Sequence, residues 1–452
     1  MNSLIDKYNI PGPRYTSYPT VPYWDESNFN TELWKKSVTQ SFRESNRDEG
    51  ISLYIHLPFC ESLCTFCACH KRITKRHEVE KPYIETVLKE WNLYLNLFDE
   101  KPLIKELHLG GGTPTFFSPE NLTWLLTEIF SKAEIAENPD FSFEGHPNNT
   151  SREHLQALYD LGLRRCSFGV QDYDLQVQQA INRVQPFETV KKVTEWAREI
   201  GYASVSHDLV FGLPFQTMEK MEFTIRKTME LQPDRLAFYS YAHVPWIKGV
   251  GQRGFDENDL PNGEEKRKLY ENGKKLFEKL GYIEVGMDHF SLPEDELYQS
   301  LINGKIHRNF MGYTSSKTQL MIGLGMSAIS DSWYAFAQNE KTVEDYQKRV
   351  ENGEIPVFRG HILNEEDLVI RKHILNLMCR MEINWNDHTF VPEMKNTLQQ
   401  LKEMEKDNLI EIGENSIKIT EKGKAFTRNV AMAFDLRMLR NQPETRIFSM
   451  TV

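Results

Sequence analysis

Short β-type runs alternate with amphipathic helical stretches between residues 50 and 245, and this alternation constrains the fold more than any other feature. Several helical patterns begin with good N-terminal signals, such as Ser118-Pro119-Glu120. Because repeated strand–helix units place their strands side by side in parallel, six in succession predict an α/β protein with a partial (β/α)6 barrel or a complete one. A doubly wound open sheet is the competing arrangement. The expected strands are Ile51–His56, Glu106–Leu109, Phe141–Glu144, Arg165–Gly169, Ser204–Phe211 and Arg235–Tyr241, and the expected helices are Val79–Leu97, Pro119–Lys132, Ser151–Leu161, Phe187–Ile200 and Thr217–Leu231.

Polar or glycine-rich residues stand at the C-terminal ends of all six predicted strands. In a parallel β/α barrel this rim is where catalytic groups converge. A carboxylate in an apolar strand, such as Asp208, is costly unless a partner or ligand satisfies it. The rim residues in chain order are the cysteine loop from Cys60, the run Gly110-Gly111-Gly112-Thr113-Pro114-Thr115, then Glu144, Gln171-Asp172, Asp208 and Ala242-His243.

Four of the six cysteines lie within ten residues, directly after the first predicted strand. Cys60, Cys64 and Cys67 have the spacing C-x3-C-x2-C, whereas Cys69 falls outside this triad and suits a packing role. Three thiolates can hold three irons of a cubane cluster and leave the fourth iron open to a small chelating ligand. A zinc site would need a second cysteine pair, and the other two cysteines stand alone in sequence. The cluster is therefore the favoured interpretation.

The charge balance narrows the possible partners. With 54 basic and 65 acidic residues the net charge is −11, which argues against a nucleic-acid or anionic-membrane partner. No apolar stretch approaches the length of a membrane span. The polar N-terminus lacks an apolar signal region, and reduced cysteines suit a reducing compartment. We expect a cytoplasmic protein.

The chain divides into three predicted regions. Residues 1–48 form an extension over the barrel, residues 49–360 the barrel and its own extension, and residues 361–452 a mostly helical C-terminal domain. The last region has the outline of a winged-helix module, a type of domain that often binds DNA. Residues 365–452 carry 13 Lys/Arg against 14 Asp/Glu, so the basic footprint of a DNA-binding domain is missing and a lid or scaffold is favoured. Its expected elements are helices Asn364–Met381 and Met394–Lys406, the hairpin Leu409–Ile419 and a closing helix Glu421–Phe434.

The cysteine spacing resembles that of the radical S-adenosylmethionine (SAM) superfamily. Longer motifs extend the resemblance, over nearly the whole chain, to the oxygen-independent coproporphyrinogen III oxidases of haem biosynthesis. These motifs are Arg14–Thr20, Tyr54–Cys69, Gly110–Thr115, Gly169–Asp172, Asn182-Arg183, Asp208–Pro214, Tyr241–His243, Gly286–Phe290, His307–Phe310 and Ser327–Ser330.

The resemblance implies an oxidoreductase that decarboxylates two propionates of coproporphyrinogen III to vinyls, giving protoporphyrinogen IX, by means of a 5′-deoxyadenosyl radical made from SAM. It implies one 4Fe–4S cluster per chain, held by Cys60, Cys64 and Cys67, and two SAM molecules. The residues implied for the first SAM are Tyr54, Gly111, Glu144 and Ile329, and those for the second are Phe66, Gly112, Thr113, Gln171, Arg183, Asp208 and Ala242.

The resemblance also implies partners. The enzyme would receive electrons from a reductant such as flavodoxin or ferredoxin and would use an electron acceptor of unknown identity. It would be a monomer. The carboxylates of the substrate would need cationic side chains, and Arg14 and Arg308 are candidates on charge alone.

The chain departs from the pattern of the family at a few positions. The usual Glu-x-Asp-Pro reads Glu144-Gly145-His146-Pro147, and Ala68, His70 and Met311 replace commoner residues. Three other functions stay open: a haem-trafficking chaperone, a tetrapyrrole-acting methyltransferase or haem-ring-opening enzyme, and an iron–sulfur regulator that binds DNA through the C-terminal module. The identity of the product separates the first two from the decarboxylase.

Overall fold

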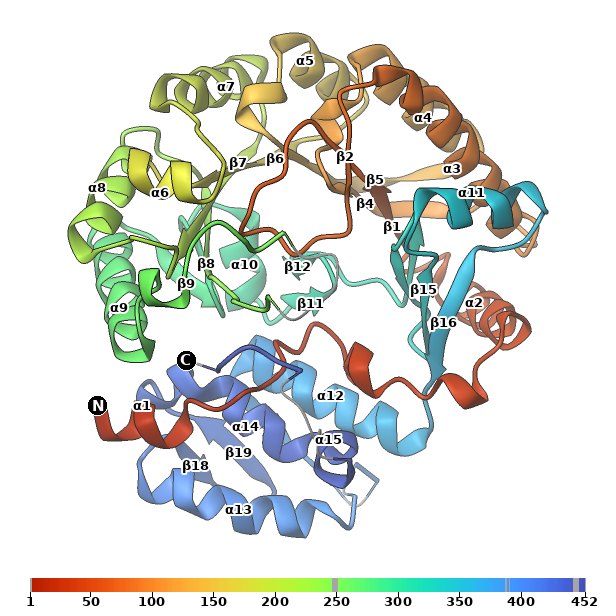
Figure 1. The fold of residues 1–452 in the computed structure, drawn as a ribbon. Helices are drawn as coiled ribbons and strands as arrows, with labels where there is room; N and C mark the ends of the chain where they lie inside the picture. The colour runs from red at the N-terminus through yellow and green to blue at the C-terminus, as the bar shows by residue number, and fades with distance from the viewer. Residues whose placement is uncertain (1, 246–250, 387, 390, 442–446, 452) are drawn as a thin grey trace.

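The computed structural model describes residues 2–245, 251–386, 388–389, 391–441 and 447–451. A curved sheet of twelve strands forms its main body (Figure 1). The six predicted strands are confirmed: they pair in parallel with their neighbours in chain order. They are β1 (Ile51–Leu57), β4 (Leu103–Gly111), β5 (Glu134–Gly145), β6 (Arg165–Gln171), β7 (Ser204–Phe211) and β8 (Arg235–Ser240).

The sheet is a partial barrel. Strand order runs from β1 to β8 without a reversal, so the switch point of a doubly wound sheet does not occur. The sheet ends at β16 (Val357–Ile362) on one side and β9 (Ile283–Gly286) on the other, and no pairing joins them within the described residues. The intervening helices lie outside the curve (Figure 1). They are α3 (Glu80–Leu95), α4 (Pro119–Ser131), α5 (Arg152–Asp160), α7 (Phe187–Ile200) and α8 (Met218–Met229).

Both edges of the sheet hold short strands that the sequence analysis did not predict. Next to β1 lies β13 (Leu320–Leu324), in parallel, although about 270 residues separate the two along the chain. From β13 the sheet continues antiparallel through β14 (Ile329–Asp331) and β15 (Ala335–Asn339), and β10 (His289–Ser291) pairs with β8 at the opposite edge. The other described elements of this part are α1 (Asn2–Tyr8), α2 (Thr31–Ser45), β2 (Phe59–Cys60), β3 (Arg72–Ile73), α6 (Leu175–Ala180), α9 (Gly263–Lys279), α10 (Glu296–Ile302), β11 (His307–Asn309), β12 (Gly312–Thr314) and α11 (Val343–Glu351).

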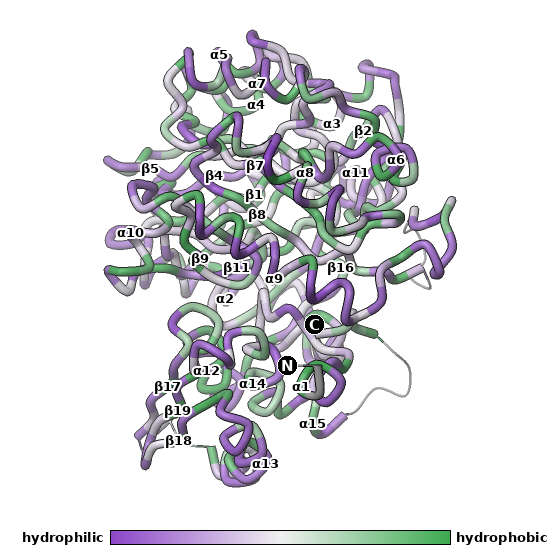
Figure 2. Tube along the Cα trace, turned by 90° about the vertical axis from the view of Figure 1, so that its left-hand side faces the viewer, coloured by the Kyte–Doolittle hydropathy of each residue, from purple (hydrophilic) through white to green (hydrophobic). Residues whose placement is uncertain are grey.

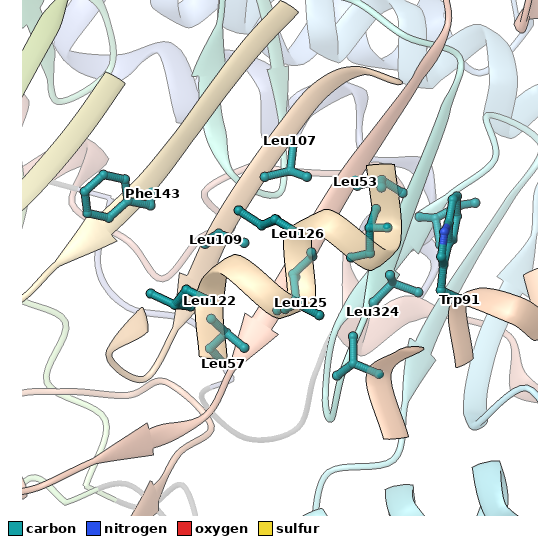
Figure 3. Packing of buried hydrophobic residues seen from close by; sticks show 14 of the residues in the cluster. Leu53, Leu57, Trp91, Leu107, Leu109, Leu122, Leu125, Leu126, Phe143 and Leu324 are labelled. Atoms are coloured by element: carbon teal, nitrogen blue, oxygen red, sulfur yellow. The ribbon is translucent and has the colours of Figure 1, made fainter. Parts of the chain in front are cut away.

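Helix α4 illustrates how the helices hold the sheet. Ser118 caps it by accepting a hydrogen bond from Asn121 N at 3.2 Å, and Pro119 occupies the first turn. Its leucines Leu122, Leu125 and Leu126 are fully buried and face the strand leucines Leu107 and Leu109 (Figure 3). Each such buried side chain stabilises the fold by about 1.5–3 kcal/mol relative to its exposed state. The same core extends under α3 and β5.

The C-terminal module packs below the sheet, with both chain ends beside it (Figure 2). The predicted order of helix, helix, hairpin and helix occurs, although a 3-10 turn at Lys422–Phe426 replaces the first part of the closing helix. Tyr8, Tyr15 and Tyr18 of the N-terminal extension belong to the hydrophobic core of this module. The elements are α12 (Glu365–Arg380), β17 (Glu382–Asn384), α13 (Met394–Lys406), β18 (Ile410–Ile412), β19 (Ser416–Ile419), α14 (Thr427–Phe434) and α15 (Leu436–Arg440).

A search of the described residues finds no helix that combines the length and the apolar character needed to cross a membrane. The first and last residues of the predicted regions, Met1 and Val452, lie outside the described residues.

Candidate functional site

A cavity of about 180 Å³ opens at the C-terminal ends of the central strands, beneath the loop that follows β1. We call it the cluster cavity. The structure brings eleven of the fourteen predicted site residues into its lining. They are Cys60, Cys64, Phe66, Cys67, Gly111, Gly112, Thr113, Glu144, Gln171, Arg183 and Asp208.

The glycines at the end of β4 allow it to approach the cysteine loop closely. Gly112 N donates to Leu57 O at 2.9 Å, and Thr113 Oγ1 lies 3.3 Å from Cys60 Sγ. A Cβ atom on Gly112 would stand 2.5 Å from the carbonyl oxygen of Pro58. Gly111 has a φ of +115°, a backbone conformation that favours glycine. The run of glycines is therefore required by this contact.

The three cysteines of the motif face the cluster cavity together. Burial raises the pKa of the Cys60 thiol to about 11, whereas the hydrogen bond with Cys69, helped by the Lys71 ammonium, lowers that of Cys67 to about 6. Arg183 Nη1 lies 3.7 Å from the buried Cys64 Sγ. Within the described residues, no three His, Cys, Asp or Glu side chains are placed to hold a single metal ion. Three thiols around one cavity fit a cluster, in which each cysteine serves a different iron.

Two carboxylates enter the cluster cavity from β5 and β7. The Asp208 carboxyl forms no hydrogen bond or ion pair with any described residue, and burial, together with the Glu144 charge, raises its pKa to about 7. Glu144 is half-exposed and lies 3.3 Å from His108 Nε2. Both can accept hydrogen bonds from the amino or hydroxyl groups of a ligand.

Strand β6 lies between β5 and β7 and supplies the part of the cavity lining between these carboxylates. Arg183 Nη2 donates to Gly169 O at 2.6 Å, and Gln185 Nε2 donates to the same oxygen at 3.2 Å. A Cβ atom on Gly169 would stand 2.6 Å from Gln171 Nε2 and 2.8 Å from Arg183 Nη2. Glycine at this position therefore leaves room for both side chains.

Three predicted residues, Tyr54, Ala242 and Ile329, are not in the lining of the cluster cavity. The ring of Tyr54 stacks on that of His108, with 6.1 Å between centroids. Ala242 O accepts a hydrogen bond at 2.7 Å from Gln252 Nε2, which also donates to the backbone of the cysteine loop. Tyr54 and Ala242 thus border the site, whereas Ile329, the first residue of β14, packs against a hydrophobic cluster that contains Trp24 and Phe336.

Four residues depart from the family pattern, and the structure shows what surrounds each of them. The backbone of Ala68 does not adopt a positive φ. His70 Nδ1 lies 3.0 Å from Ser327 Oγ. His146 lines the cluster cavity, and burial with the nearby Arg183 charge lowers its pKa to about 3, so its ring is neutral. Met311, in the β11–β12 turn, does not line this cavity.

The two arginines predicted to face the substrate have different roles. Arg308 is buried and donates to the backbone oxygens of Arg14 and Tyr15, both at 3.3 Å, so it holds the N-terminal segment. Arg14 pairs with Asp288 and lines a second cavity of about 320 Å³, between the barrel and the C-terminal module. We call this the module cavity.

Tyr239 is a partly buried residue whose phenol oxygen lies 3.3 Å from His289 Nε2. Tyr239 on β8 carries a pKa raised by burial and by the Asp208 charge, while the Arg14 charge opposes this increase.

Some lining residues escaped the sequence analysis. Ser167 and Gly169 share with Gln171 the alternating positions of β6, so the period of two along a strand could have identified them once Gln171 was chosen. No comparable signal marks Lys71, in the loop before β3, or Asn149, at the end of the 3-10 turn Pro147–Asn149.

Comparisons with known proteins agree with this geometry. Residues 54–228 match the family model described as the Radical SAM superfamily. The chain is 39% identical over 442 residues to an oxygen-independent coproporphyrinogen III oxidase of Helicobacter pylori (strain J99), covering 95% of each protein. It is 34% identical over 457 residues to that of Escherichia coli (strain K12), covering 100% of this chain and 98% of the relative. The solved structure of coproporphyrinogen III oxidase (HemN) from Escherichia coli superposes with a TM-score of 0.89 at 32% identity, over 96% of this chain and 98% of that one.

Proposed function

This chain belongs to the oxygen-independent coproporphyrinogen III oxidases, which are radical SAM enzymes, and we propose that it converts two propionates of coproporphyrinogen III to vinyls, giving protoporphyrinogen IX. Each propionate would lose carbon dioxide, one hydrogen atom and one electron. The observation that carries the proposal is the convergence of three thiols, a glycine loop and two carboxylates on one cavity at the rim of the barrel.

The superfamily uses a 4Fe–4S cluster and SAM, and the residues of the cluster cavity fit both. We assign Cys60, Cys64 and Cys67 to one cluster per chain; when bound with SAM, it supplies a 5′-deoxyadenosyl radical. Two of these thiols already have polar neighbours, Thr113 and Arg183, which tune the charge on sulfur.

Two SAM molecules are part of the proposal. Glu144 and Asp208 enter the cavity from different strands, and neither forms an ion pair with a Lys or Arg among the described residues. Each carboxylate is therefore able to hold the amino or ribose hydroxyl groups of a separate SAM molecule. The residues predicted for the two molecules, apart from Tyr54, Ala242 and Ile329, surround this space.

The module cavity supports the substrate side of the proposal. Six Lys or Arg side chains and four Asp or Glu side chains line it, a surplus of positive charge that suits propionate carboxylates. Arg14 lines this cavity together with Asp288, with which it forms an ion pair. We place the carboxylates of coproporphyrinogen III in the module cavity, with the regions 1–48 and 361–452 covering the open side of the barrel, residues 49–360, and excluding water.

The surface of the cysteine loop supports the proposed partner in electron transfer. Leu63 and Cys69 on this loop are exposed, which leaves the cluster close to an external reductant such as flavodoxin or ferredoxin. An acceptor must also take the electron that each decarboxylation leaves behind. We propose a monomer that works in the cytoplasm.

The test is anaerobic reconstitution of the cluster, followed by incubation with SAM, a reductant and coproporphyrinogen III and by mass spectrometry of the oxidised tetrapyrroles. The expected product has lost two formic-acid equivalents, and a Cys64→Ala control yields none. Cleavage of SAM with an intact substrate would overturn the proposal. A methylated or opened ring would establish one of the alternative functions, and tetrapyrrole binding without turnover would establish a chaperone.

A further inference from the structure

A third cavity, of about 530 Å³, lies between the β11–β12 hairpin, the turn before β15 and helix α12. We call it the basic cavity. Its charged and aromatic lining residues are Lys305, His307, Lys317, Trp333, Lys372 and Arg380. Its volume is within the range of about 300–1,000 Å³ that is typical of small-molecule sites.

The basic cavity is separate from the cluster cavity. No described residue lines both. Ser315 lines the basic cavity and donates a hydrogen bond to Asp140 Oδ2 at 3.3 Å. Asp140 precedes Glu144 by four residues along β5. At roughly 3.3 Å per residue, the two positions are about 13 Å apart along the strand. The basic cavity therefore lies toward the opposite end of the sheet from the cysteine loop.

The charge of this lining is one-sided. Lys305, Lys317, Lys372 and Arg380 contribute four positive charges, and no Asp or Glu is among the described lining residues. None of the four forms an ion pair with another described residue, in a chain whose net charge is −11. Like charges gathered around a cavity create a local positive potential that attracts an anion.

A buried side chain in the same lining lacks a partner. His307 is 9% exposed, and its ring forms no hydrogen bond within the described part of the chain. Burial, assisted by the charges of Arg371 and Lys317, lowers its pKa to about 3, so the ring is neutral. A neutral imidazole has one N–H donor and one acceptor nitrogen. Neither ring nitrogen is fully enclosed, so a ligand in the cavity that accepts a hydrogen bond can reach the N–H donor.

The rest of the lining is apolar. Ile306 and Cys379 are buried, Leu375 is partly buried, and Trp333 adds an indole at the edge. Apolar and aromatic surface surrounded by cations fits a flat apolar body that carries several carboxylates. Inorganic phosphate would use the cations alone and leave the apolar surface unused.

We propose that the basic cavity binds a carboxylated tetrapyrrole at a site separate from the one where the reaction occurs. The macrocycle lies against Trp333 and Leu375, and its carboxylates contact the rim lysines, with His307 as a hydrogen-bond donor. The inference rests on the proposed function, because the substrate of that reaction is a tetrapyrrole with four carboxylates. The site holds such a molecule outside the cluster cavity, either before or after the reaction.

The test uses coproporphyrin III, the oxidised and stable form of the substrate, in equilibrium dialysis against the full-length protein with its cluster. The double variant Lys317→Glu/Lys372→Glu removes two rim cations. The matched control is Lys81→Glu/Lys402→Glu, which changes the net charge equally at exposed positions outside the cavity. Since each charge-assisted contact is worth about a tenfold change in affinity or more, we expect one of two binding equivalents to weaken at least about tenfold in the first variant and neither in the control.

Binding that is equal in the rim variant and the control would overturn the inference. Displacement of coproporphyrin III by an equal concentration of inorganic phosphate would also overturn it, because it would reveal a general anion site. Failure of the proposed function is distinguishable. Coproporphyrinogen III that stays intact while lysine-dependent binding persists refutes the decarboxylase but not the site, and decarboxylation without lysine-dependent binding refutes the site alone.

Discussion

Charged side chains are paired with one another at one end of the central sheet, whereas at the other end a carboxylate is left without a partner. At the amino ends of the strands, Arg165 pairs with Asp140 at 2.5 Å and Arg235 pairs with Asp295 at 2.7 Å, all four side chains being mostly buried. At the carboxyl ends, Asp208 has no hydrogen-bond or ion-pair partner among the described residues. The first end holds the barrel together, whereas the second keeps its polar groups available for a ligand.

The pKa values express the same difference. Burial opposes ionisation of Asp140, but the Arg165 and Arg235 charges outweigh it and lower the pKa of this carboxyl. For Asp208, burial and the Glu144 charge outweigh the opposing charge of Arg183, and the pKa of this carboxyl rises to about 7. A carboxyl group with such a raised pKa lowers the stability of the ligand-free protein at neutral pH. We therefore expect its role to be the binding of a ligand.

The largest expected effect is at the paired end. Asp295→Ala leaves the Arg235 guanidinium, which is 8% exposed at its side chain, without its carboxylate, and it removes the acceptor of Ser204 Oγ. Breaking a buried ion pair from one side costs about 3–5 kcal/mol. We expect a loss of this size in the free energy of unfolding, measured by urea denaturation under anaerobic conditions, with SAM binding unchanged in the folded fraction.

The matched control is an exposed ion pair. Arg43 and Asp99 lie 3.0 Å apart with side chains 63% and 58% exposed. Asp99→Ala should change the free energy of unfolding by less than about 1 kcal/mol, as for other surface pairs. Equal losses of stability in Asp295→Ala and Asp99→Ala would show that burial does not determine how much an ion pair contributes to stability.

A second prediction concerns the backbone at the ligand-binding end of the sheet. Gly112→Ala would bring a Cβ to within 2.5 Å of Pro58 O, so the end of β4 or the cysteine loop must shift. Overpacking of this kind costs about 1–3 kcal/mol. We expect SAM cleavage by the reconstituted enzyme to fall at least about tenfold, since a displaced loop misplaces the cysteines.

Gly353→Ala is the matched control for Gly112→Ala. Gly353 has a φ of +76°, and no heavy atom lies within 4 Å of the position that a Cβ would take, so alanine strains only its own backbone. A loss of about 1 kcal/mol in stability with full SAM cleavage is expected. Equal losses of SAM cleavage in both glycine variants would contradict the role given to the contact with Pro58.

These contrasts explain which parts of the molecule the sequence could predict. The six parallel strands were predictable because each joins the next through a helical connection, so local periodicity carries the information. Strand β13 was not, because its five residues pair with β1 across most of the chain, so no local periodicity links the two strands. Short edge strands depend on distant partners more than on their own residues.

The functional end follows the same logic. Cysteines, glycines and carboxylates at strand ends are visible in the sequence because their residue types are unusual there. The pairing of Arg235 with Asp295 was not visible, since nothing local connects a strand residue with the start of a helix 60 positions later. The position of Ile329 away from the cavity lining also depended on β13 and its neighbours.

A third prediction sharpens the role of the unpaired carboxylate. Asp208→Asn keeps the size of the side chain and removes its charge. Because hydrogen bonds to charged groups contribute about 1.5–3 kcal/mol, SAM affinity measured by dialysis should fall by about 10- to 100-fold. The stability of the ligand-free protein should not fall, in contrast to Asp295→Ala. An Asp208→Asn variant that unfolds more easily at pH 8 would place Asp208 with the structural charges instead.

A fourth prediction concerns pH. The pKa of Asp208 is about 7 in the folded protein against an ordinary value of 3.8, so the folded state binds more protons between these two values. Stability therefore falls as the pH rises from about 4 to 7, and the full cost is present above pH 7. In the absence of SAM, Asp208→Asn should be more stable than the parent at pH 8 and equal to it below about pH 4. A gain that is the same at both pH values would contradict the assigned shift.

The smallest effect is expected where the chain departs from the family pattern. His146→Asp restores the usual Glu-x-Asp-Pro and sets a carboxylate near Arg183, where the parent has a neutral imidazole. This makes the ligand-binding end resemble the paired end, but at a partly exposed position where ion pairs contribute about 0–1 kcal/mol. Stability should rise by no more than that amount, and the affinity for SAM, measured by dialysis at pH 7, should change by less than about fivefold, because Arg183 can still reach Gly169 O. A loss comparable to that of Asp208→Asn would mean that Arg183 itself must stay unpaired for SAM to bind, and the contrast between the two ends would then extend from the carboxylates to the cations of the cluster cavity.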